Sequence, residues 1–484
     1  MDIKRLTALK TPEQFRDHIT QLGIDLPFDD TVTVGDDSPL EQSVTVDGHT
    51  IGNRWAINPM EGWDGTTTGG STANMKRRWE RFGLSGAKFI WGGEAMAVRA
   101  DGRANPNQLI MNKENQKDIQ DLQDHLIATH KEQFGTTDDL FVGFQLTHSG
   151  RFCRPNDKKV IEPRVAYLHP VLDKKFNVTG QECVWTDAEV DGLIQDYIDA
   201  AKLSHACGAK FVDIKHCHGY LLHEFLSAHT RPGSYGGSFE NRTRILREIV
   251  KGIKSECPGM SIGVRVSIFD YVPYRPDPDK NDGKKLGPGV PEEYAHAMPY
   301  NYGFGTNPEN PIEYDLSEPI KFLQLLEELG VKLVNFSAGS PYYNPHIQRP
   351  ALYPPSDGYQ ICEDPLVGVA RQLKVTKELK LKFPNLYIVG SAYSYLQEWL
   401  PNVAQHFVRE GYVDFAGLGR IVLSYPDLPV DVKNGNGLQK KKVCRTFSDC
   451  TTAPRNGIIS GCFPLDDFYK KSDEYAQLQA IKKG

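Results

Sequence analysis

Eight short runs of β-branched or aromatic residues recur along this chain of 484 residues, and longer amphipathic stretches separate them. The runs are Arg54–Asn58, Lys88–Gly92, Leu140–Leu146, Lys210–Lys215, Ser261–Ser267, Lys332–Phe336, Leu386–Val389 and Val413–Ala416. Helical periodicity is clear over Asp187–Ala206, Asn241–Glu256 and Pro319–Leu329. Strands alternating with helices are typical of a parallel sheet, and eight such units close a barrel. The sequence therefore predicts an α/β fold, a (β/α)8 TIM barrel.

The segments outside this pattern divide the chain into three parts. We expect an N-terminal extension (residues 1–53), the barrel (54–435) and a C-terminal extension that contains cysteines (436–484), all within one domain. Ser43–Ile51 alternates apolar and polar residues around Asp47-Gly48, a strong hairpin signal. We expect this hairpin to cap the N-terminal mouth of the barrel.

Two connections, 155–187 after the third strand and 271–318 after the fifth, are longer than a barrel needs. Loops of this length are typical of lids or binding elements. The second contains Tyr271, Tyr274, Tyr300 and Tyr302. These side chains either wall an active site or stabilise a surface excursion by packing on one another.

The fourth strand ends in a group of polar residues. Its apolar run stops at Lys215, His216, His218 and Tyr220, at the end of the strand where barrel enzymes keep their chemistry. The segment continues to Arg231 and to Tyr235-Gly-Gly-Ser-Phe-Glu-Asn-Arg242. This pattern resembles the Old Yellow Enzyme superfamily of FMN-dependent oxidoreductases, whose fourth strand ends in His-x-x-His/Asn-Gly-Tyr-Leu.

Other strand ends carry the same resemblance, which implies FMN bound without a covalent link. Gln145-Leu-Thr-His-Ser-Gly-Arg151 matches a motif whose glutamine amide both donates to and accepts from the pyrimidine ring. Arg265 is the cation beside the flavin, and the ends of strands seven and eight are the phosphate site. The cofactor-binding candidates are Pro59, Met60, Glu61, Gly93, Gln145, Arg265, Gly390, Ser391, Gly419 and Arg420.

For catalysis, the resemblance implies that Tyr220 gives a proton to the substrate carbon opposite the one that receives hydride. His218 occupies the second carbonyl-binding position of the family, and Lys215 stands where the family usually has histidine. An ammonium there either contacts a substrate oxygen or pairs with a local acid. We expect His216 and Cys217 to be structural.

The C-terminal cysteines resemble a motif of the subgroup that includes trimethylamine dehydrogenase and 2,4-dienoyl-CoA reductase. That motif has four cysteines and holds an iron–sulfur cluster, whereas this chain has Cys444, Cys450 and Cys462, with Phe447 in place of the motif's second cysteine. Because a [4Fe–4S] cluster ordinarily takes four thiolates, three outcomes stay open. The cluster has been lost, another ligand completes it, or a labile site survives.

Composition limits the remaining options. A net charge of −6 excludes a basic nucleic-acid footprint, and no window is long and apolar enough for a membrane helix, so we expect neither partner. Nine cysteines in a long chain without an apolar signal core favour reduced thiols and a cytoplasmic location. A homo-oligomer stays open.

We therefore predict an oxidoreductase that reduces an activated C=C bond of a small molecule, with NADH or NADPH as reductant. One alternative is oxidation or C–N cleavage of a small, anionic substrate by the same flavin barrel. The other is a binding protein without flavin, because a fold alone does not fix a reaction.

Overall fold

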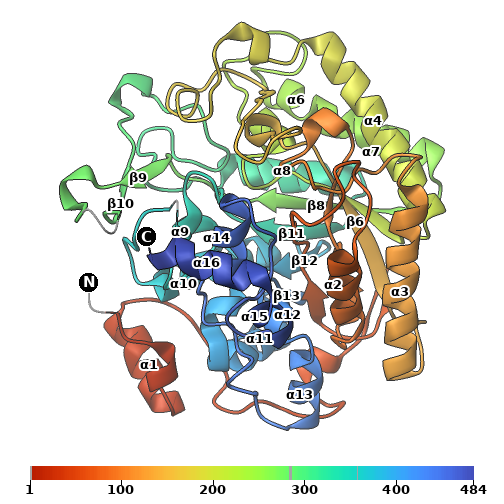
Figure 1. The fold of residues 1–484 in the computed structure, drawn as a ribbon, viewed down its shortest axis with the longest axis vertical. Coiled ribbons are helices and arrows are strands. Elements are labelled where there is room, and N and C mark those ends of the chain that lie inside the picture. The colour runs from red at the N-terminus through yellow and green to blue at the C-terminus, as the bar shows by residue number, and fades with distance from the viewer. Residues whose placement is uncertain (1–2, 283–285, 357, 484) are drawn as a thin grey trace.

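The computed structural model describes residues 3–282, 286–356 and 358–483, so residues 283–285 of the second long loop lie outside the described part. Eight parallel strands form a closed ring in the order β3, β4, β6, β7, β8, β11, β12, β13, and β13 pairs with β3 again (Figure 1). Their bounds are β3 Trp55–Ile57, β4 Phe89–Ile90, β6 Phe141–Thr147, β7 Phe211–Ile214, β8 Ser261–Ser267, β11 Leu333–Ser337, β12 Tyr387–Gly390 and β13 Phe415–Leu418. The predicted barrel is confirmed.

Helices surround the ring and follow its strands along the chain (Figure 1). They are α2 Ala73–Gly83, α3 Gln116–Phe134, α4 Asp187–Ala206, α7 Arg244–Glu256, α8 Ser317–Glu328, α10 Pro365–Lys382 and α11 Leu400–Arg409. The helix predicted over Asn241–Glu256 is divided at Thr243, which ends the short α6 (Phe239–Arg242) before α7 begins. Among the described residues, no helix is long and apolar enough to span a bilayer.

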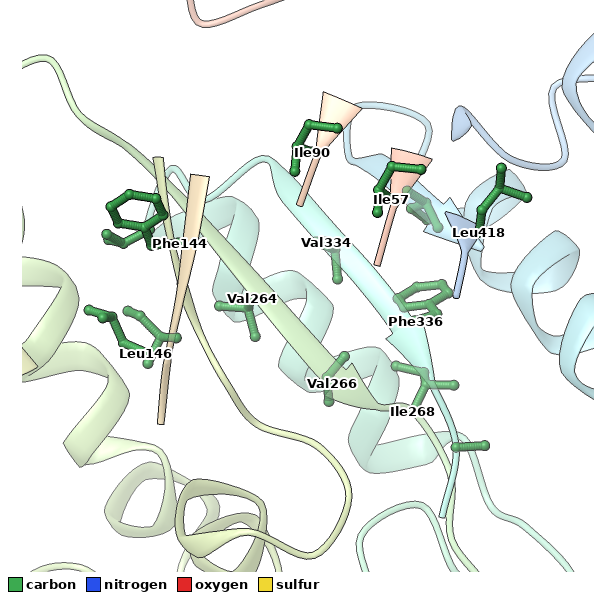
Figure 2. Packing of buried hydrophobic residues seen from close by; sticks show 14 of the residues in the cluster. Ile57, Ile90, Phe144, Leu146, Val264, Val266, Ile268, Val334, Phe336 and Leu418 are labelled. Carbon is green, nitrogen blue, oxygen red and sulfur yellow. The ribbon is translucent and has the colours of Figure 1, made fainter. Parts of the chain in front are cut away.

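Successive side chains of each strand point to opposite faces of the sheet, so the strand side chains form two separate layers. One side chain set, which includes Ile57, Val264 and Val334, packs between the strands and the helices (Figure 2). The intervening residues point into the barrel, where Phe89, Phe141, Phe211, Leu333, Val389 and Phe415 form an aromatic and aliphatic floor. Above that floor the interior residues become polar, so the apolar core ends below the C-terminal mouth.

The N-terminal hairpin closes the other mouth. Strands β1 (Val44–Val46) and β2 (His49–Ile51) pair antiparallel, and Asp47 and Gly48 both have positive φ, as a type I′ turn requires. Val46 and Ile51 are fully buried against the aromatic floor. The hairpin is thus the cap that the sequence predicts.

The two long loops pack on each other. Tyr300 of the second loop contacts the His169 ring nitrogen of the first at 3.3 Å, and Tyr167 donates to the Tyr302 carbonyl at 3.2 Å. A small sheet of β9 (Tyr274–Pro276) and β10 (Gly289–Pro291) supports the second loop. Its tyrosines therefore stabilise an excursion of the chain, which is the second of the two alternatives.

The C-terminal extension contributes α14 (Asp449–Arg455), α15 (Asp467–Lys470) and α16 (Asp473–Lys483). These helices lie across the barrel beside α12 (Ile421–Ser424), in blue in Figure 1. Asp466 accepts two hydrogen bonds from Arg77 of α2, and the Ser460 amide donates to the Gly62 carbonyl at 3.0 Å. The extension is thereby fastened to the loops around the C-terminal mouth.

Candidate active site

A cavity of about 210 Å³ opens at the C-terminal ends of the strands. Predicted site residues that are far apart in the sequence line this cavity, because the C-terminal ends of parallel strands meet at one mouth of the barrel. The sequence-predicted residues that line it are Pro59, Met60, Glu61, Gln145, Lys215, His218, Tyr220, Arg265, Ser391, Gly419 and Arg420. The C-terminal extension adds Cys450, one of the three cysteines of the C-terminal motif, together with Thr451, Pro454, Arg455 and Ser460, which the family motifs did not indicate.

Two predicted glycines lie behind this lining. A Cβ atom on Gly93 would come within 2.4 Å of the Trp79 indole, so this glycine makes room for a core side chain. Gly390 packs against Tyr393, and the glycines that line the cavity are Gly417 and Gly419. The approach of bare backbone to the cavity therefore comes from other positions than Gly93 and Gly390.

Asp213 organises the bottom of the cavity. It is fully buried and accepts hydrogen bonds from the Gln145 amide nitrogen (2.6 Å), the Trp91 indole (2.7 Å) and the Arg265 backbone amide (2.7 Å). Burial raises the pKa of Asp213 to about 6. Sequence reasoning missed this residue, although an acid inside the apolar run from Phe211 to Ile214 was the signal.

The residues at this end fit an isoalloxazine ring. Asp213 fixes the Gln145 amide nitrogen, and no hydrogen bond within the described residues uses the amide oxygen, which stays available for a ring N–H. The Arg265 guanidinium is buried, and its Nε has no partner in the described part of the chain. A buried cation without a bonded acceptor is costly unless a ligand completes it, which fits the electron-rich pyrimidine edge of FMN.

The opposite end of the cavity is strongly cationic. Arg420, Arg349 and Arg455 all line it. Burial and the neighbouring Arg349 lower the pKa of Arg420 to about 10, and one nitrogen of Arg349 has no partner among the described residues. Converging guanidinium groups of this kind suit a phosphate. Sequence reasoning missed Arg349 and Arg455 because they follow no barrel strand directly.

Replacing Arg420 by alanine should weaken FMN retention by about 10- to 100-fold, since a hydrogen bond to a charged group contributes about 1.5–3 kcal/mol. Equilibrium dialysis with FMN measures this change. Arg420→Lys keeps the charge but loses the planar guanidinium fork. Its affinity for FMN should therefore lie between those of the parent protein and Arg420→Ala. Equal FMN affinity in Arg420→Ala and the parent protein would place the phosphate elsewhere.

Tyr220, Glu61 and Lys215 form one contact group near the chemistry end. The Tyr220 hydroxyl donates to the Glu61 carboxylate, with oxygen distances of 3.0 and 3.1 Å. The Lys215 Nζ lies 3.4 Å from Glu61 Oε1 and 3.6 Å from the Tyr220 ring centroid. Of the two roles open to Lys215, the structure places it as the partner of a local acid.

His218 is held in an unusual conformation at the cavity wall. Its φ is +68°, a region that non-glycine residues seldom adopt and that often marks a functional site. Its Nε2 contacts the Ser337 hydroxyl at 2.9 Å, and its carbonyl accepts from Ser340. Burial together with nearby Arg265 and Lys215 lowers the pKa of His218 well below its usual range, so the ring is neutral.

The two residues between Lys215 and His218 face the core. His216 is fully buried, and its Nδ1 contacts the Ile214 carbonyl at 2.8 Å. Burial lowers the pKa of His216 to about 4 and raises the pKa of Cys217 to about 11. Both are thus neutral packing residues.

The three C-terminal cysteines do not fit an iron–sulfur cluster. Within the described residues, no group of three His, Cys, Asp or Glu side chains is placed to hold a metal ion. Burial raises the pKa of both Cys444 and Cys462. Phe447, in place of the motif's second cysteine, stacks on Tyr353 with ring centroids 5.5 Å apart.

Comparisons with known proteins identify the family that this chain resembles. Residues 40–280 match the family model of the NADH:flavin oxidoreductase / NADH oxidase family. An NADPH dehydrogenase of Geobacillus sp. (strain WCH70) is 31% identical over 232 residues, which cover 47% of this chain and 63% of that protein. An NADH oxidase of Thermoanaerobacter brockii is 26% identical over 336 residues, or 65% of this chain and 42% of that protein.

Solved structures share the fold. A 2-naphthoyl-CoA reductase complex superposes with a TM-score of 0.64 at 18% identity and covers 90% of this chain and 58% of its own. An old yellow enzyme homologue from Zymomonas mobilis has a TM-score of 0.56 at 17% identity and covers 84% and 96%.

The fold and the site define a flavin-binding (β/α)8 barrel. The chain belongs to the NADH:flavin oxidoreductase / NADH oxidase family, within the Old Yellow Enzyme superfamily, and its cofactor is FMN. It spans 42–63% of the length of the curated relatives named above.

Proposed function

We propose that this protein is an NAD(P)H-dependent FMN oxidoreductase that reduces an activated C=C bond of a small molecule. The observation that carries the proposal is the single cavity in which Gln145, Arg265 and Arg420 lie with Tyr220 and His218. The first three suit the two ends of FMN. The other two suit a carbonyl-conjugated double bond beside the flavin ring.

Each residue has a defined part in this reaction. The neutral His218 binds the substrate carbonyl through a ring N–H, which polarises the double bond without transferring a proton. Gln145, Arg265 and Arg420 would hold FMN, which, when bound and reduced by NADH or NADPH, would supply the hydride for the β carbon. Tyr220 then protonates the α carbon, because its hydroxyl lies in the cavity and a phenol is a competent acid toward a developing carbanion.

The alternative of an anionic substrate, oxidised or cleaved at a C–N bond, depended on a free Lys215 ammonium. Glu61 compensates that charge at 3.4 Å. We therefore favour reduction. The flavin-free alternative conflicts with the buried Arg265 Nε, for which the described residues offer no acceptor. The cytoplasmic location and the oligomeric state stay predictions.

Two linked measurements test the proposal. Acid precipitation of the purified protein should leave yellow FMN in the supernatant, since no cysteine lies near Pro59 to form a covalent bond. Anaerobic NADH or NADPH should then bleach the flavin band of the intact protein, and 2-cyclohexenone should restore it. A colourless protein would contradict flavin binding, colour in the pellet would contradict non-covalent binding, and bleaching by an amine instead of a nicotinamide would favour oxidation.

A further inference from the structure

Tyr220 is largely buried at the wall of the cavity. The residue is only 3% exposed, and its recorded hydrogen-bond partners are the Glu61 carboxylate and, at 3.1 Å, the Tyr342 hydroxyl. Burial and the charge of Glu61 raise the pKa of Tyr220 well above its usual range. A phenolate left here after proton transfer would therefore be unstable, and turnover requires a nearby group that returns a proton to it.

Glu61 is placed to be that group. Both of its carboxylate oxygens lie within 3.1 Å of the Tyr220 oxygen. Its side chain is 13% exposed, against 4% for Lys215, and it lines the open cavity. Of these contact partners, Glu61 is thus the acid that reaches both the phenol and the solvent side.

Lys215 makes this arrangement electrostatically feasible. Its ammonium contacts the carboxylate at 3.4 Å and lies 3.6 Å from the centre of the phenol ring. One cation therefore stabilises negative charge on either oxygen as the proton moves between them. Without it, the carboxylate would oppose formation of the phenolate.

We propose that Glu61 is a proton-transfer residue that carries protons from the cavity to Tyr220. This inference rests on the proposed reduction. The Tyr220 O–H bond breaks as a C–H bond forms at the substrate α carbon, while hydride from reduced FMN forms the C–H bond at the β carbon. The protonated Glu61 carboxyl gives its proton to the Tyr220 oxygen, and the carboxylate takes a proton from water.

The groups that face Glu61 come from three elements. Lys215 and Cys217 follow β7, Tyr220 precedes α5 (Leu221–Leu226), and Tyr342 follows β11, with Arg154 and Arg455 acting on Tyr342. Lys215 is the cation in contact with the carboxylate. Proton return to Tyr220 should therefore depend on the Glu61 carboxyl group.

The variant Glu61→Gln tests the proposal, because glutamine keeps the size and a hydrogen-bond acceptor but transfers no proton. Two rates with 2-cyclohexenone would be compared: single-turnover reoxidation of the reduced holoenzyme by stopped flow, and steady-state turnover with NADPH. The first uses the proton already on Tyr220, whereas the second requires that proton to be replaced. Glu61→Gln should therefore lower the steady-state rate by about tenfold or more and change the single-turnover rate much less.

Tyr342→Phe is the matched control, since it removes a hydrogen bond of equal length to Tyr220 but no acid. It should keep the parent ratio of steady-state to single-turnover rate. The flavin spectrum after gel filtration confirms that each variant is folded and loaded. A Glu61→Gln enzyme that keeps the parent ratio overturns the proton-transfer role alone. Failure of the parent enzyme to react with any enone overturns the proposed function, and this inference with it.

Discussion

Replacing Tyr220 by phenylalanine should slow reoxidation of the reduced flavin by an enone by about 10²- to 10⁴-fold, the range typical of losing a general acid. The substitution removes one oxygen and leaves the ring, which packs in a cluster with Phe152 and Tyr343. Reduction of the flavin by NADH or NADPH should change much less, because that step takes no proton from a phenol. Stopped-flow measurement of the two half-reactions separates them.

Tyr343→Phe is a suitable control. Tyr343 is also a buried phenol that donates to a carboxylate, in its case Asp270 at 2.6 Å, and the cavity lining does not include it. This variant loses a comparable hydrogen bond and should retain most of its substrate-driven reoxidation. If Tyr220→Phe and Tyr343→Phe react with the enone at similar rates, the proton comes from another group, and Tyr220 is a packing residue.

The barrel was predictable from the sequence because strand burial and period leave a strong pattern. All eight predicted strands are present, and β8 matches its predicted bounds, Ser261–Ser267. The polar residues at the strand ends were equally informative, because the C-terminal ends of parallel strands meet at one mouth of the barrel. Gln145, Lys215 and Arg265 meet in the cavity for this topological reason.

Contacts between remote segments could not be predicted in the same way. Glu61 and Lys215 are separated by 154 positions, and nothing in either motif indicates that their side chains meet. Arg455 reaches the cavity from the C-terminal extension, whose position depends on tertiary contacts such as that between Arg77 and Asp466. A motif specifies which residues stand at a strand end, whereas the partner of each depends on how loops pack.

The Glu61 contact changes what is expected of Lys215. Replacing Lys215 by methionine should destabilise the protein by about 1–3 kcal/mol, because it leaves a partly buried carboxylate without its cation. It should also slow enone-driven reoxidation by about 10²- to 10³-fold, the range typical of losing one electrostatic stabiliser of the transition state. Thermal unfolding and stopped-flow reoxidation measure the two effects separately.

The double variant Lys215→Met with Glu61→Gln distinguishes charge compensation from catalysis. If the ion pair is the source of the stability loss, removing both charges should recover most of the unfolding free energy, and the two substitutions should be strongly non-additive. Reoxidation should stay slow in the double variant, since neither the cation nor the proton-transferring acid remains beside Tyr220. Fast reoxidation in Lys215→Met alone would mean that Lys215 serves only as the structural partner of Glu61. The neutral His218 would then bind the substrate carbonyl without help from a nearby cation.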